Sequence, residues 1–99
     1  MKFAAVIQYT PDSATIVAAR PSHREYLTRI KAADKLVMSG PFEGDTGAVI
    51  VYEAESAAEA EQLLKDDPFY KSGVFTSYTI HQWNVVFAHP KLVPELPRS

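Results

Sequence analysis

The chain has 99 residues, of which 46% are apolar and 22% charged, and its formal net charge is −2 at pH 7. This length and balance predict one globular domain with a single modest core. The Lys and Arg residues are scattered, so no basic patch would neutralise a row of phosphates, and we expect no nucleic-acid partner. The absence of cysteine excludes disulfides, thiolate catalysis and cysteine-bound metals.

The segment from Phe3 to Tyr9 is rich in β-branched and aromatic residues and is apolar on both faces. This pattern is typical of a central strand that is covered on both sides. The apolar run at the N-terminus breaks at Gln8, which makes it too short for a signal sequence or a membrane span. We therefore expect a cytoplasmic protein without membrane contact.

A helix is predicted to begin at Ser22, because Ser22 and Glu25 have the S-x-x-E spacing of a capping box. Pro21 stands just before this box, and residues 15–19 suit either a helix or a short loop. The apolar side chains that follow recur at helical spacing and form one stripe: Tyr26, Ile30 and Ala33. The stripe would face a sheet.

Two strands are predicted in the middle of the chain, at residues 36–39 and 48–53. Gly40 and Pro41 end the first strand, and the turn residues 43–47 connect it to the second. The two strands should therefore pair like a hairpin.

A second helix is predicted to begin at the capping box of Ser56 and Glu59. It should end at Asp67-Pro68, since the residue before a proline is pushed out of the helical region. Residues 75–86 alternate and predict a long fourth strand.

The order of elements is β-α-β-β-α-β, which predicts an α+β, ferredoxin-like fold with a four-stranded antiparallel sheet and both helices on one face. The other face also has apolar residues, and such a face is usually buried against a second copy. We expect a homodimer through this open face, as a dimeric α/β barrel or within a larger assembly, with His81 near the interface. The domain would span residues 1–88, followed by a proline-rich tail at 89–99.

Two short stretches are candidates for chemistry, at residues 20–23 and 66–69. Each places an ionisable side chain next to a proline where a helix meets a loop, so His23 and Asp67 can form an acid–base pair. At a helix start, the helix dipole would disfavour the protonated His23 ring. The alternatives are a surface histidine and an aspartate that only stops a helix, with Asp66 as a competing carboxylate.

The turn after residue 39 is a second candidate, because Ser39 can donate a hydrogen bond and Gly40 allows a ligand to approach closely. Phe42 and Phe69 can line an apolar pocket for a planar ligand, although such aromatic residues are more often part of a core or an interface. The adjacent Asp66 and Asp67 do not supply the three or four ligands that a metal needs, so we expect no metal site.

These motifs, in this order, resemble the YciI-like proteins, the family of the YCII-related domain: R-P-S-H at 20–23, S-G-P at 39–41 and D-D-P-F at 66–69. The resemblance covers roughly residues 3–87 and implies a ferredoxin-like fold and a dimeric α/β barrel. It also implies a site that pairs His23 with Asp67, with the turn at 39–41 beside the same pocket. The loop after this turn is shorter than in many relatives and the tail is an extension, so the substrate class does not carry over.

From residues and resemblance together we expect a cofactor-independent lyase, isomerase or hydrolase acting on a small, cyclic or aromatic metabolite. His23 would move a proton and Asp67 would orient the imidazole. The predicted substrate contacts are Ser39, Gly40, Pro41, Phe42, Pro68 and Phe69. The alternative is a non-catalytic dimeric module that binds a small molecule or belongs to a larger complex, and a cofactor-free monooxygenase is a third option.

Overall fold

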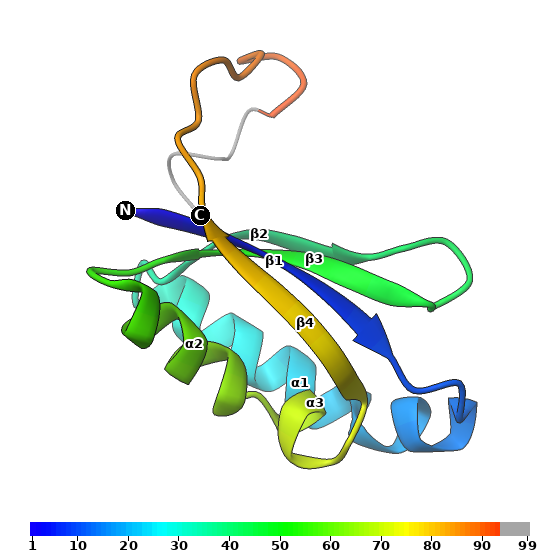
Figure 1. The fold of residues 1–99 in the computed structure, drawn as a ribbon. Coiled ribbons are helices and arrows are strands. Elements are labelled where there is room, and N and C mark those ends of the chain that lie inside the picture. The colour runs from blue at the N-terminus through cyan, green and yellow to red at the C-terminus, as the bar shows by residue number, and fades with distance from the viewer. Residues whose placement is uncertain (94–99) are drawn as a thin grey trace.

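The computed structural model describes residues 1–93. It has the strands β1 (Lys2–Tyr9), β2 (Leu36–Pro41), β3 (Gly47–Glu53) and β4 (Phe75–Gln82) and the helices α1 (Ser13–Ala32), α2 (Ala57–Lys65) and α3 (Pro68–Lys71). The strands form one antiparallel sheet in the order β2-β3-β1-β4. All helices lie on one face of this sheet (Figure 1). The predicted α+β fold is therefore confirmed, with α3 as an additional single turn.

The two central strands, β1 and β3, carry the core on the face that the helices cover. Their facing pairs there are Phe3–Tyr52, Ala5–Ile50 and Ile7–Ala48, and all six residues are buried. Gly47 begins β3 where the backbones come close, because a Cβ atom at this position would overlap the carbonyl oxygen of Ile7. The sheet thus requires a glycine at residue 47.

The predicted start of the first helix is wrong. Helix α1 begins nine residues earlier, at Ser13, where the Asp12 carboxylate caps the helix by accepting a hydrogen bond from the N–H of Ala14 (3.1 Å). Ile16 in its first turns is buried, and this packing holds the helix together although Pro21 inside it cannot donate a backbone hydrogen bond. His23 therefore lies in the middle of α1, and the expected influence of a helix start on its charge does not apply.

Two strand ends also differ from the prediction. Strand β2 continues through Gly40 to Pro41, which is possible because β2 is an edge strand and a proline there does not interrupt the sheet. Strand β4 ends at Gln82 instead of residue 86. Gln82 pairs with Phe3, close to the beginning of β1, so further residues of β4 find no partner strand.

The second helix follows the prediction closely at its start and ends two residues before the predicted Asp67-Pro68. Ser56 caps α2 by accepting a hydrogen bond from the N–H of Glu59 (3.1 Å), and the Glu59 carboxylate accepts one from the N–H of Glu55 (2.9 Å). Helix α2 ends at Lys65, and the chain then enters α3. No helix within residues 1–93 is long and apolar enough to cross a membrane.

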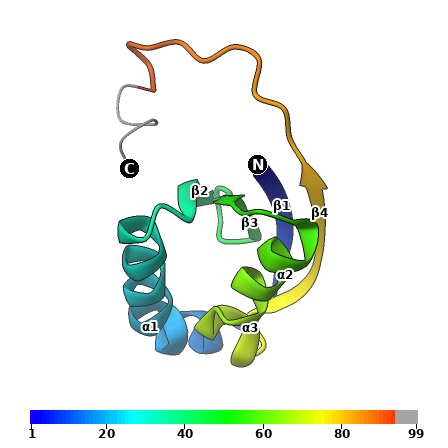
Figure 2. The ribbon, with the colours of Figure 1, turned by 90° about the vertical axis from the view of Figure 1, so that its left-hand side faces the viewer.

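The face of the sheet away from the helices is partly apolar and partly exposed. Val6 in β1 is 47% exposed, and His81 in β4 is exposed on the same face, as expected. Residues 83–93, which include the first part of the predicted tail at 89–99, arch over this side of the sheet (Figure 2). Together with β2 and β3 they line an open cavity of about 220 Å³, and Phe87 is 93% exposed. The rest of the predicted tail, 94–99, lies outside the described residues.

Candidate active site

The structure brings His23 and Asp67 together, although they are 44 residues apart in the chain. His23 Nδ1 lies 2.8 Å from Oδ1 and 2.9 Å from Oδ2 of Asp67. His23 is 7% exposed and the Asp67 side chain is fully buried. The competing carboxylate, Asp66, is exposed and accepts a hydrogen bond from the Gln62 side chain instead. His23 and Asp67 therefore form a buried hydrogen-bonded pair in the protein interior.

Asp67 is held in place by the start of α3, of which it is the N-cap residue. Its backbone is extended (φ −69°, ψ 132°), as favoured before Pro68, and its Oδ1 accepts a hydrogen bond from the N–H of Phe69 (2.8 Å). The carboxylate therefore orients the imidazole and caps a helix at the same time. The alternative drawn from the sequence, an aspartate that only stops the second helix, does not describe Asp67, because α2 ends at Lys65 and Asp67 begins α3.

The imidazole of His23 is fixed by aromatic packing as well as by Asp67. Its ring stacks on that of Phe69, with 3.8 Å between centroids and 3° between planes, and Phe75 approaches from the edge at 6.3 Å. Because the carboxylate accepts a hydrogen bond from Nδ1–H, Nε2 keeps its lone pair free to accept a proton. Nε2 forms no hydrogen bond within residues 1–93.

A cavity of about 180 Å³ opens beside His23, between α1 and the sheet. Five of the predicted site residues line it: His23, Ser39, Gly40, Pro41 and Phe69. Asp67 lies behind the imidazole and does not reach the cavity surface. Phe42 follows β2 and is 43% exposed, and Pro68 is the first residue of α3; neither lines the cavity.

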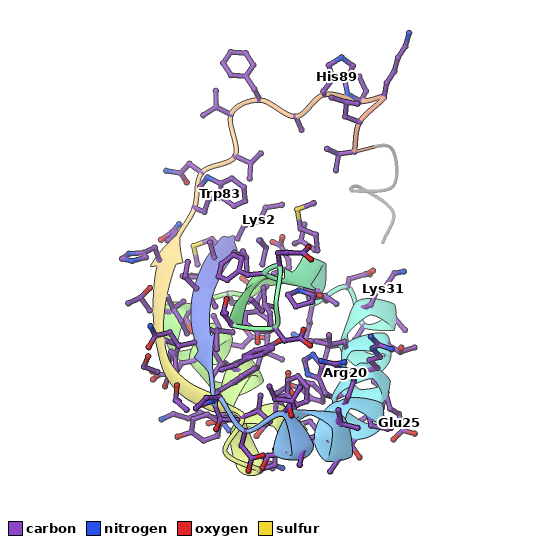
Figure 3. The ribbon with its side chains drawn as sticks, turned by 90° about the vertical axis from the view of Figure 1, so that its right-hand side faces the viewer. Lys2, Arg20, Glu25, Lys31, Trp83 and His89 are labelled. Carbon is purple, nitrogen blue, oxygen red and sulfur yellow. The ribbon has the colours of Figure 1, made fainter. Side chains whose placement is uncertain are left out.

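Two arginines that the sequence analysis did not single out also line this cavity, Arg20 and Arg24. Arg20 lies on the inner side of α1, whereas Glu25 points outward (Figure 3). The Arg20 guanidinium Nη2 is 3.1 Å from Oδ2 of Asp45, in the turn between β2 and β3, where Asp45 has a left-handed backbone (φ 56°). Arg20 precedes His23 by three residues, a helical spacing that could have identified it, and Arg24 follows Arg20 by four residues.

Tyr9, at the end of β1, also lines the cavity and was likewise missed. Burial, followed by the negative charge of Asp67, raises the pKa of Tyr9 to about 12. Its hydroxyl therefore stays protonated near neutral pH and can donate a hydrogen bond to a ligand. Within residues 1–93, no group of three or more His, Cys, Asp and Glu side chains could hold a metal ion.

The fold and the site together define a small α+β protein that holds a buried His–Asp pair beneath a cavity lined by arginine, serine and aromatic side chains. The chain belongs to the family of the YCII-related domain, whose sequence profile matches residues 1–84. The resemblance inferred from the sequence motifs is thereby confirmed.

Three known proteins are similar to this chain in sequence or in structure. The uncharacterized protein YjpA of Bacillus subtilis (strain 168) is 40% identical over 63 residues, which are 64% of this chain and 73% of YjpA. A solved structure of TftG, the 5-chloro-2-hydroxyhydroquinone dehydrochlorinase of Burkholderia phenoliruptrix AC1100, in complex with 2,5-dihydroxybenzoquinone, is 30% identical. It superposes with a TM-score of 0.75 over 85% of this chain and 94% of TftG. Rv0793 of Mycobacterium tuberculosis, 13% identical with a TM-score of 0.56 over 89% of this chain and all of Rv0793, shares the fold.

Proposed function

We propose that this protein is a cofactor-independent enzyme that moves a proton on a small cyclic or aromatic metabolite. The observation that carries the proposal is the buried His23–Asp67 pair, which leaves Nε2 of His23 free at the edge of a cavity. A base held in one orientation and one tautomer is the main requirement for such chemistry. The likeness to TftG, a dehydrochlorinase, supports a ring substrate and an elimination.

In the proposed reaction Nε2 accepts a proton from a ring hydroxyl or an acidic ring carbon. The electron pair left behind spreads over the conjugated ring and its oxygens, and Arg20 and Ser39 stabilise the resulting anion. Return of the proton to a ring carbon gives the keto tautomer, which is an isomerisation. Where that carbon bears a leaving group, transfer of a second hydroxyl proton to Nε2 expels the group with its bonding electron pair and completes an elimination. Tyr9, protonated near neutral pH, can donate a hydrogen bond to the same anion.

Asp67 is a positioning residue in this scheme. Its carboxylate holds the Nδ1–H tautomer and stabilises the imidazolium that forms when Nε2 takes the proton. A base of this kind contributes roughly 10²–10⁴ in rate. Gly40 and Pro41 shape the wall opposite the imidazole, and contacts of Phe42 and Pro68 with a substrate stay predictions.

The proposal is tested with 5-chloro-2-hydroxyhydroquinone and with other hydroxylated ring compounds, by following product formation and chloride release. We expect turnover by the native protein and a loss of about 10²–10⁴ in rate in His23→Gln. His81→Gln, which changes a histidine on the other face of the sheet, is the matched control and should leave the rate unchanged. Equal rates in the native protein and His23→Gln would contradict the proposal.

The second candidate is a module that binds a ring compound in the same cavity without converting it. In that case 2,5-dihydroxybenzoquinone should bind to the native protein, and His23→Gln should change the affinity by no more than a few fold. No substrate of the series would be converted.

We further propose that the open face of the sheet is covered by a second copy of this chain. Val6 and Met38 are exposed there, and the tail adds Val86 and Phe87, which are 78% and 93% exposed. Burial of these apolar side chains against a partner would remove them from water and stabilise a dimer. Sedimentation equilibrium should show a dimer that Val6→Lys dissociates, while Glu25→Lys on the outer side of α1 should not. A monomeric native protein at high concentration would refute the dimer.

A further inference from the structure

Arg24 is a charged residue of the cavity wall that has no role in the proposed reaction. It lies one helical turn after Arg20 on α1, and both arginines line the cavity. Asp45 forms an ion pair with Arg20, whereas no carboxylate within residues 1–93 forms an ion pair with Arg24. The guanidinium of Arg24 is therefore available to a ligand.

The charges around the cavity are unbalanced in favour of an anion. Arg20 and Arg24 are both among the lining residues, but no Asp or Glu side chain is. The buried Asp67 carboxylate stands behind the imidazole and already accepts hydrogen bonds from His23 and from the N–H of Phe69. A negatively charged ligand thus meets two cations on the cavity wall, of which Arg20 is paired with Asp45 and Arg24 has no carboxylate partner within residues 1–93.

The spacing of the two arginines lets both contact one ligand. Residues four apart on a helix are neighbours on its surface, with Cβ atoms about 5–6 Å from each other. His23 lines the same cavity, so a ring that both arginines contact would lie near the imidazole. Guanidinium groups are well suited to bind the oxygens of carboxylates and other anions.

We propose that Arg24 selects ring substrates with two anionic oxygen groups. One anionic oxygen lies near the dyad, at Arg20 and Ser39, and the second, an ionised hydroxyl or a carboxylate, is bound by Arg24 at the rim of the cavity. This inference rests on the proposed function, because it assumes that the cavity holds a ring. Arg24 is then a specificity-determining residue and takes no part in the proton transfer.

The test compares two probes by titration calorimetry. In 2,5-dihydroxybenzoquinone both hydroxyls are vinylogous carboxylic acids and are ionised at neutral pH, and 2-hydroxy-1,4-benzoquinone carries one such group. We expect Arg24→Gln to weaken binding of the doubly charged probe about tenfold and of the singly charged probe less than about twofold. Arg24→Lys should retain part of the preference, because it keeps the charge but not the planar guanidinium.

Lys31→Gln is the matched control, since it removes one positive charge from the same helix at an exposed residue outside the cavity. It should change neither affinity. Equal weakening of both probes by Arg24→Gln would overturn the proposal, and so would a native protein that binds neither probe or does not prefer the doubly charged one. Because binding is measured without turnover, a charge preference that depends on Arg24 would stand even if His23→Gln showed that the catalytic proposal is wrong.

Discussion

The two faces of the sheet have similar residues but different surroundings. On the covered face Ile7 and Ile50 are 1% exposed, and the helices deliver His23 and Asp67 to the interior beside them. On the open face Val6, the neighbour of Ile7 in β1, is 47% exposed. Alternation within a strand therefore does not determine which face becomes a site. The site forms where the middle of α1 and the start of α3 bring His23 and Asp67 together over the apolar residues of the sheet.

The largest effect is expected where the strands of the core approach most closely. Gly47→Ala would place a methyl group against the backbone carbonyl of Ile7, and backbone atoms cannot move aside cheaply. We expect a loss of about 3 kcal/mol or more in the free energy of unfolding, measured in urea. Gly40→Ala is the matched control, because nothing lies within 4 Å of its added Cβ. A similar loss in both variants would refute the explanation.

A somewhat smaller loss is expected at the dyad. Asp67→Ala removes the cap of α3 and leaves the Nδ1–H of His23 buried without its partner. These two effects together should reduce the free energy of unfolding by about 2–4 kcal/mol. Asp66→Ala changes the preceding, exposed aspartate and should cost less than about 0.5 kcal/mol. Comparable losses would mean that the buried pair does not stabilise the covered face.

Tyr52, also on the covered face, is expected to respond in the opposite direction. Its hydroxyl is buried and has no hydrogen-bond partner among the described residues, so Tyr52→Phe should stabilise the protein by about 1 kcal/mol. Unfolding curves at neutral pH test this, with Tyr70→Phe, at a more exposed ring, as the control. Destabilisation by Tyr52→Phe would reveal a partner of the hydroxyl in solution.

The same residue gives a dependence on pH. Burial, with the Asp67 charge second, raises the pKa of Tyr52, and the pKa values of Tyr9 and Tyr26 are raised to about 12. The unfolded chain thus loses these protons from about pH 10, where the folded protein still holds them, so stability is lost as the pH rises through this range. The decline should be less steep in Tyr52→Phe.

The smallest effect is expected on the open face. Val6→Thr keeps the shape of an exposed side chain and should change the stability of the isolated chain by less than about 0.5 kcal/mol, whereas Ile7→Val on the covered face should cost about 1 kcal/mol. If a second copy covers Val6, the stability of the native protein rises with protein concentration and Val6→Thr weakens this dependence. Thermal unfolding at several concentrations measures both.

Hydrophobic periodicity and turn residues were sufficient to predict the order of the elements and the single-sided layer of helices. The beginning of α1 was missed because the capping box at Ser22 and Glu25 was the strongest local signal, while the cap at Asp12 depends for its stability on burial of Ile16. The end of β4 depends on where β1 begins, which is a property of the pairing and not of the local sequence.

For the site, His23 and Asp67 were predicted from their motifs, but the contact between them depends on α3, a single turn that was not predicted. Arg20, Arg24 and Tyr9 were missed because their importance follows from the cavity, which is lined by residues of five separate elements. The cytoplasmic location and the division into a domain at 1–88 and a tail at 89–99 stay predictions.

The left-handed backbone of Asp45 and its ion pair with Arg20 matter for any attempt to make the protein more heat-resistant. A left-handed backbone costs most residues about 1–2 kcal/mol, aspartate less and glycine least, so Asp45→Gly would relieve part of this cost in the turn after β2. The same change would release Arg20 from its ion pair at the cavity. A library selected for heat resistance would therefore enrich glycine at this residue and lose the anchored guanidinium, so the two properties must be selected together.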